Sequence, residues 1–82
     1  MTYKLYEDVI LTADLPQYGL CAGDVGTLVE RHVGTGKEDG YSVEFFDMTG
    51  KTLAVATVAA NCLRPPTSAD RPSTRTLVKT SA

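Results

Sequence analysis

The chain has 82 residues, 43% of them hydrophobic and 22% charged, and its formal net charge at pH 7 is −2. A chain of this length forms one small domain at most. No run approaches the roughly 18 apolar residues that a membrane span needs, and the N-terminal segment carries Glu7 and Asp8 where a signal peptide has its apolar core. We therefore expect a cytoplasmic location with no membrane partner, where Cys21 and Cys62 stay reduced.

The charge is distributed unevenly along the chain. Residues 1–66 hold five Lys and Arg side chains against nine Asp and Glu, which gives −4, whereas residues 67–82 hold three against one, which gives +2. An acidic body argues against the binding of phosphates to its surface.

Five short strands are predicted in chain order. They cover residues 8–13 (DVILTA), 25–33 (VGTLVERHV), 41–47 (YSVEFFD), 51–58 (KTLAVATV) and 62–64. In the third strand, strict alternation turns Tyr41, Val43 and Phe45 inward and leaves Phe46 outward. In the second strand, apolar residues fall on both faces, so the pattern leaves its register open.

Turn residues separate the strands. Residues 34–40 (GTGKEDG) predict a hairpin loop, and residues 47–51 (DMTGK) predict a tighter hairpin with Gly50 in the left-handed region. A helical turn is expected within residues 59–63. Strands and hairpins at this spacing indicate an all-β fold, a small five-stranded closed barrel.

A double proline, Pro65-Pro66, is expected to end the domain, because proline cannot donate to a strand ladder. We thus predict a β-barrel domain over residues 1–66 and a flexible Ser/Thr/Pro-containing tail over residues 67–82. Within this tail, residues 74–80 (TRTLVKT) have the composition of a strand that would pair if offered a sheet edge.

The connection between the first two strands is rich in glycine. Gly19, Gly23 and Gly26 predict backbone at positive φ or close to another strand, and together with Asp24 they form the predicted fold-determining turn. The larger side chains of this connection, Leu15, Tyr18 and Leu20, are expected to close one end of the barrel.

Two resemblances follow from these residues. The spacing of Gly23, Gly26 and Leu28 resembles the G-x-x-G-x-V core of SH3-like barrels, including KOW-type modules of ribosomal and transcription proteins. Residues 7–65 more closely resemble a family of small bacterial proteins, frequent in cyanobacteria and of unknown function, with the signature DLPxYGLxxGDVGTxVE. That resemblance implies an SH3-like barrel whose gene often stands beside that of another small protein. Cys21 departs from the family pattern, which usually has a basic residue there.

Catalytic chemistry has little support in the sequence. His32 is the only histidine, and Cys21 and Cys62 lie far apart without a C-x-x-C motif. The favoured interpretation of the two cysteines is that they are small apolar residues, one in a loop and one in the last strand, and a redox-sensitive pair is the alternative. The glycine-rich loop over residues 34–40 is not followed by the Lys-Ser/Thr pair or the helix N-terminus of a phosphate-binding loop. We predict no catalytic, metal-binding or cofactor-binding residue, no cofactor, and no enzyme.

Binding is the predicted function. An outward Phe46 and a lid residue Tyr18 are the predicted partner-binding residues, although the tail or a neighbouring loop is an equally good cover for Phe46. The first hypothesis is a non-catalytic protein-interaction module, either antitoxin-like or an accessory subunit of a neighbouring gene product. The alternative is a KOW-like nucleic-acid-binding module, which the acidic body disfavours. A homo-oligomer also remains open.

Overall fold

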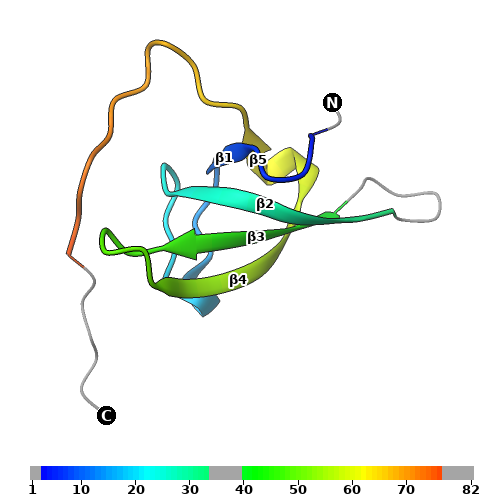
Figure 1. Ribbon diagram of the computed structural model, residues 1–82, viewed down its shortest axis with the longest axis horizontal. Coiled ribbons are helices and arrows are strands. Elements are labelled where there is room, and N and C mark those ends of the chain that lie inside the picture. The colour runs from blue at the N-terminus through cyan, green and yellow to red at the C-terminus, as the bar shows by residue number, and fades with distance from the viewer. Residues whose placement is uncertain (1–2, 34–39, 77–82) are drawn as a thin grey trace.

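A computed structural model describes residues 3–33 and 40–76 of the chain. The described residues form one antiparallel sheet in the order β4-β3-β2-β1-β5 (Figure 1). Its elements are β1 (Asp8–Leu11), η1 (Pro16–Tyr18), β2 (Val25–His32), β3 (Gly40–Phe46), β4 (Thr52–Ala59), η2 (Ala60–Cys62) and β5 (Leu63–Arg64), where η1 and η2 are single 3-10 turns. This arrangement confirms the predicted all-β, five-stranded barrel. Among the described residues, no helix is long and apolar enough to cross a membrane.

The sheet is curled into a half-barrel that is less closed than the sequence predicts. In the described sheet, β4 and β5 are the two edges, and β5 pairs only with β1. The two-residue length of β5 has a simple cause, because Pro65 and Pro66 follow it and offer no backbone N–H. Within residues 3–33 and 40–76, the eight-residue strand β4 therefore keeps one open edge.

The core fills the concave side of this sheet. As predicted, Tyr41, Val43 and Phe45 are buried, whereas Phe46 is 43% exposed. The other buried hydrophobic residues are Tyr3, Val9, Ile10, Leu11, Leu20, Leu28, Ala56, Val58 and Leu63.

The first strand is shorter than predicted and buried on both of its faces. It ends at Leu11, and Val9, Ile10 and Leu11 are all at most 5% exposed. Val9 and Leu11 belong to the core cluster, whereas Ile10, on the opposite face of β1, is buried outside that cluster.

The register of the second strand is set by an irregularity at Val29. Leu28 pairs with Val43, but the next pairing is Glu30 with Ser42, so Val29 is an extra residue. A bulge of this kind shifts the alternation of inward and outward residues. Before the bulge, Val25 is exposed and Leu28 is buried, so apolar residues lie on both faces of this strand.

The turns after β3 and β4 lie where the sequence predicts them. Gly50 has φ +90°, and Asp47 Oδ1 accepts hydrogen bonds from the backbone N–H groups of Thr49 (2.8 Å) and Lys51 (2.9 Å). The helical turn η2 lies within the predicted range. The predicted hairpin loop over residues 34–39 is outside the described residues.

An N-terminal contact that the sequence did not indicate closes the core near β5. The Tyr3 ring packs edge-on against Tyr41 at a centroid distance of 5.5 Å, and the Tyr3 hydroxyl donates to the Leu63 carbonyl at 3.1 Å. Tyr3, the first described residue, is thereby buried, with a relative exposure of 8%.

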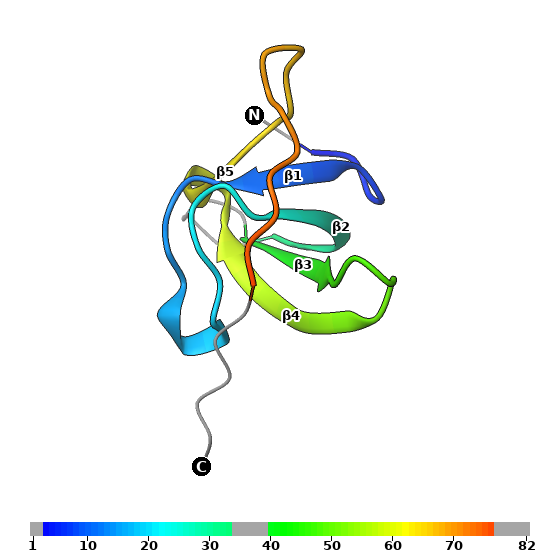
Figure 2. The same ribbon diagram turned by 90° about the vertical axis from the view of Figure 1, so that its left-hand side faces the viewer.

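Residues 65–76 contain a turn at 68–69 and no helix or strand. Figures 1 and 2 show that this tail crosses the end of the barrel at which the β3–β4 hairpin lies. Of the segment predicted to pair as a strand, residues 74–76 are described and are not in a strand, and residues 77–80 are outside the described chain. The flexibility of the tail stays a prediction.

Candidate interaction surface

The connection from β1 to β2 folds into a compact lid. Leu15 and Leu20 form an isolated bridge around η1, and Gly19 ends η1 with φ +70°. Leu20 is buried, and Leu15 packs against the core. Tyr18, in contrast, is 41% exposed, so the lid rests on the two leucines.

Two glycines of the same connection have different reasons for being glycine. Gly23 has φ +95° with open space around it, so its requirement is conformational. Gly26 lies in β2, and a Cβ there would meet Val43 Cγ1 at 2.5 Å and Phe45 Cε1 at 2.9 Å. The backbone of β2 thus passes too close to β3 for any side chain at this position.

Asp24 links the lid to the tail. Its Oδ2 accepts the Cys21 N–H at 2.9 Å, and its two oxygens accept Arg75 Nε at 3.2 Å and Nη2 at 2.5 Å. Partial burial alone would raise the pKa of the Asp24 carboxyl, but the Arg75 guanidinium and the Cys21 N–H together hold that pKa below its usual range. Asp24, which was predicted as a turn residue, therefore also forms an ion pair with Arg75, 51 positions later in the sequence.

The outer face of the sheet carries a row of exposed apolar side chains at one end. Thr27, Glu44 and Val55 lie opposite one another across β2, β3 and β4. Continuing the β2–β3 register by two residues places Val25 opposite Phe46 on the same outer face. Both are exposed, at 53% and 43%.

Strand β4 completes this surface. A bulge between Phe45 and Phe46 makes Leu53 an extra residue in β4, and Leu53 and Val55 are 43% and 54% exposed. We define the apolar patch as Val25, Phe46, Leu53 and Val55. Met48, 88% exposed in the adjoining hairpin, extends it at that end.

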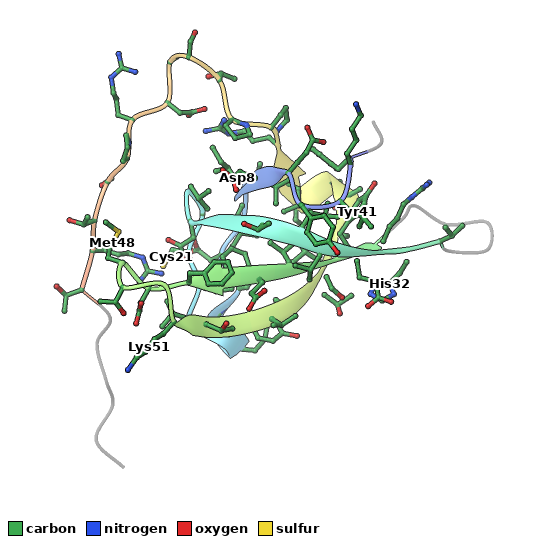
Figure 3. All side chains as sticks on the ribbon, in the orientation of Figure 1. Asp8, Cys21, His32, Tyr41, Met48 and Lys51 are labelled. Carbon is green, nitrogen blue, oxygen red and sulfur yellow. The ribbon has the colours of Figure 1, made fainter. Side chains whose placement is uncertain are left out.

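The opposite end of the outer face is polar. His32 Nε2 lies 2.8 Å from Ser42 Oγ and 3.9 Å from Glu30 Oε1. Figure 3 shows His32 at the far end of the barrel from Met48 and Lys51 in the β3–β4 hairpin. The apolar patch and the His32–Ser42 contact thus lie at opposite ends of the strands.

The two predicted partner-binding residues belong to different parts of the molecule. Tyr18 is in η1, and Phe46 is the last residue of β3 before the hairpin. In Figure 2, η1 and that hairpin lie on opposite sides of the barrel. The structure therefore groups Phe46 with Val25, Leu53 and Val55, and it does not join Tyr18 to them.

The sequence alone does not indicate Val25, Leu53 and Val55 as exposed neighbours of Phe46. In β4, the inward positions hold Ala54 and Ala56, so the alternation of large and small residues was weak. The strand contains no charged residue, and this was the signal that could have marked it as an unusual edge.

The groups with the greatest chemical reactivity are dispersed. Cys21 and Cys62 are free and half-buried. Within residues 3–33 and 40–76, no group of three or more His, Cys, Asp or Glu residues is placed to hold a metal ion.

Fold and surface together define a small antiparallel β-barrel protein with an apolar patch across β2, β3 and the edge strand β4, and with a tethered tail. The chain belongs to the family described as a domain of unknown function, DUF4926, whose model matches residues 5–65. The matched range ends one residue after β5. Comparison with curated proteins and comparison with solved structures each found no match.

Proposed function

We propose that this protein is a non-catalytic interaction module that binds another protein through the apolar patch. The observation that carries the proposal is the position of Phe46, which is 43% exposed on the outer face while its neighbour Phe45 is 2% exposed in the core. A large aromatic side chain with this exposure is a typical anchor of a protein interface.

The open edge of β4 supports the same proposal. Natural edge strands usually carry charged residues or proline that prevent pairing with other chains. The sequence of β4, TLAVATVA, contains neither. A partner that covers Leu53 and Val55 also protects this edge, and an added strand is one way in which it would do so.

Charge defines the partner further. Glu44 lies between Thr27 and Val55 in the outer face, next to the apolar patch, and residues 1–66 carry a net charge of −4. A partner with an apolar centre and a basic rim complements this surface. In this proposal, the chain acts as an antitoxin-like protein or as an accessory subunit of a neighbouring gene product.

The test is a capture experiment from the native host with the full chain, with and without nuclease. The variant is Phe46→Ala, and Val33→Ala is the matched control because Val33 is 73% exposed and lies outside the patch. We expect a protein partner that survives nuclease, that Val33→Ala retains, and that Phe46→Ala binds about tenfold or more weakly.

Two outcomes would contradict the proposal. Equal binding by the Phe46→Ala variant would remove the patch from the interface. Capture of nucleic acid, with all proteins lost after nuclease, would favour the KOW-like alternative. The acidic residues of the outer face, Glu30 and Glu44, oppose that alternative because they repel phosphates.

A further inference from the structure

Arg75 of the tail contacts two acceptors in the lid, the connection between β1 and β2. Arg75 Nε donates to Asp24 Oδ1 at 3.2 Å, and Arg75 Nη2 donates to Asp24 Oδ2 at 2.5 Å and to the Gly19 carbonyl at 3.3 Å. Two nitrogens of the Arg75 guanidinium thus contact the Asp24 carboxylate and the Gly19 carbonyl, and both of these acceptors lie in the connection between β1 and β2.

Both acceptors are held by the lid itself. The Cys21 N–H donates to Asp24 Oδ2 at 2.9 Å, which fixes the carboxylate, and Gly19 is fixed by its own N–H bond to the Pro16 carbonyl at 3.0 Å. Asp14, whose Oδ1 accepts the Ala22 N–H at 2.8 Å, adds negative charge that favours a cation at Arg75. The acceptors therefore do not depend on the tail for their positions.

The tail residues around Arg75 make the contact easy to exchange. Residues 71–76 have no regular structure, and Arg71 donates to the carbonyls of Ser68 and Asp70 within the tail. The side chains of Arg75 and Asp24 are 40% and 22% exposed. Ion pairs open to water contribute little net free energy, so another arginine competes well with Arg75.

We propose that Asp24 and Gly19 form a binding site for an arginine side chain of the partner protein, which Arg75 of the chain's own tail occupies in the unbound molecule. The proposal rests on the proposed function and names a residue type that the partner must supply. We call Asp24 and Gly19 the arginine site.

Arginine fits this site better than lysine does. A guanidinium presents several N–H donors in a fixed fork, and this fork matches a carboxylate with an adjacent carbonyl. The ammonium of lysine is a compact charge with three donors, but it lacks the planar fork that meets both carboxylate oxygens and the carbonyl together. Asp24 immediately precedes Val25 of the apolar patch. The partner segment is therefore an arginine close to apolar residues, in agreement with the basic rim inferred above.

The test uses the full chain and a synthetic peptide with the sequence of residues 70–80, DRPSTRTLVKT. Binding is followed by NMR through the backbone amides of Gly19 and Cys21, in the wild type and in Arg75→Ala. A short tether gives Arg75 an effective concentration in the millimolar range, so we expect the peptide to bind Arg75→Ala about two- to tenfold more tightly than the wild type. Arg71→Ala is the matched control and should behave as the wild type.

Two further arms keep the result specific. A peptide with lysine in place of the arginine at position 75 should bind Arg75→Ala more weakly, and Arg75→Ala/Asp24→Asn should lose the binding. Because Asp24→Asn also alters the lid, the Asp24 carboxyl is titrated separately in Arg75→Ala. Its pKa should rise when Arg75 is removed and fall again when the arginine peptide is added.

Equal affinity of the peptide for the wild type and Arg75→Ala, or for both peptides, would overturn the arginine site. An Asp24 titration unaffected by Arg75→Ala would do the same. These failures are distinguishable from failure of the proposed function. The capture experiment with Phe46→Ala tests the patch without involving Asp24, and the peptide titration does not require Phe46.

Discussion

Arg64 and Asp70 form a two-point ion pair that joins the last strand of the barrel to the tail. Arg64 Nη1 donates to Asp70 Oδ2 at 2.9 Å, and Nη2 donates to Oδ1 at 2.6 Å. The same carboxylate accepts the Thr67 N–H at 2.7 Å. The chain after Pro65-Pro66 thus turns back on Arg64 before it crosses the barrel.

This turn should respond to acid. The side chain of Arg64 and the backbone N–H of Thr67 hold the pKa of the Asp70 carboxyl well below its usual range. Because the pKa of Asp70 is lowered in the folded state, the ion pair contributes its full stability above the pKa of about 4 that Asp has in the unfolded chain. That stability is lost as the pH falls through the lowered pKa of the folded state. We expect protection of the Thr67 amide from hydrogen exchange at pH 4 and its loss well below that pH.

The matched variant is Asp70→Asn, which removes the titrating group and should abolish the pH dependence of the Thr67 amide. A midpoint at the ordinary aspartate value in the wild type would show that the ion pair does not form in solution. The first turn of the tail, after Pro65-Pro66, would then not be held to Arg64.

Gly26→Ala should be severely destabilising. The new Cβ would meet Val43 Cγ1 at 2.5 Å, Phe45 Cε1 at 2.9 Å and the Glu44 carbonyl oxygen at 3.0 Å. Because both side chains are in the packed core, neither has room to yield, and we expect a loss of about 3 kcal/mol in the free energy of unfolding. Urea unfolding measures it.

Gly23→Ala is the control for Gly26→Ala, since Gly23 has φ +95° and nothing within 4 Å of the added Cβ. Its cost is backbone strain alone, about 1 kcal/mol. Equal losses for the two variants would mean that β2 and β3 separate more readily than their packing implies.

Tyr3→Phe tests the N-terminal contact. The substitution removes the hydrogen bond from the Tyr3 hydroxyl to the Leu63 carbonyl and should lower the free energy of unfolding by about 1 kcal/mol. Burial, assisted by the neighbouring Tyr41, raises the pKa of the Tyr3 hydroxyl. Above the ordinary tyrosine value of about 10, the unfolded chain therefore loses its proton first, and stability falls as the pH rises.

Unfolding in urea at pH 9 and pH 11 separates these effects. The wild type should lose more stability between the two pH values than Tyr3→Phe does. The same loss in both proteins would assign the alkaline effect to other groups.

The sequence predicts features that depend on nearby residues better than features that depend on contacts between distant parts of the chain. Alternation in residues 41–46 and the glycine at position 50 are local signals, and the structure places both as predicted. The bulge at Val29 is set by pairing with β3, which one strand's sequence does not show.

The candidate sites show the same division. Phe46 was found from its own strand, whereas its neighbours Val25 and Leu53 come from two other strands and a bulge. The pairing of Asp24 with Arg75 spans 51 positions, so composition identified the tail as mildly basic without indicating which residue it would contact.

Phe45 and Phe46 provide the sharpest internal comparison. They are adjacent in sequence, yet Phe45 is 2% exposed and Phe46 is 43% exposed. Phe45→Ala opens a cavity in the core and should cost about 3–5 kcal/mol, which is a large share of the stability of so small a domain. Phe46→Ala removes only a partly buried ring from the outer face and should cost about 1 kcal/mol. Urea unfolding of both variants measures the difference. A comparable loss for Phe46→Ala would make it a structural residue and would remove the main support for the apolar patch as a binding surface.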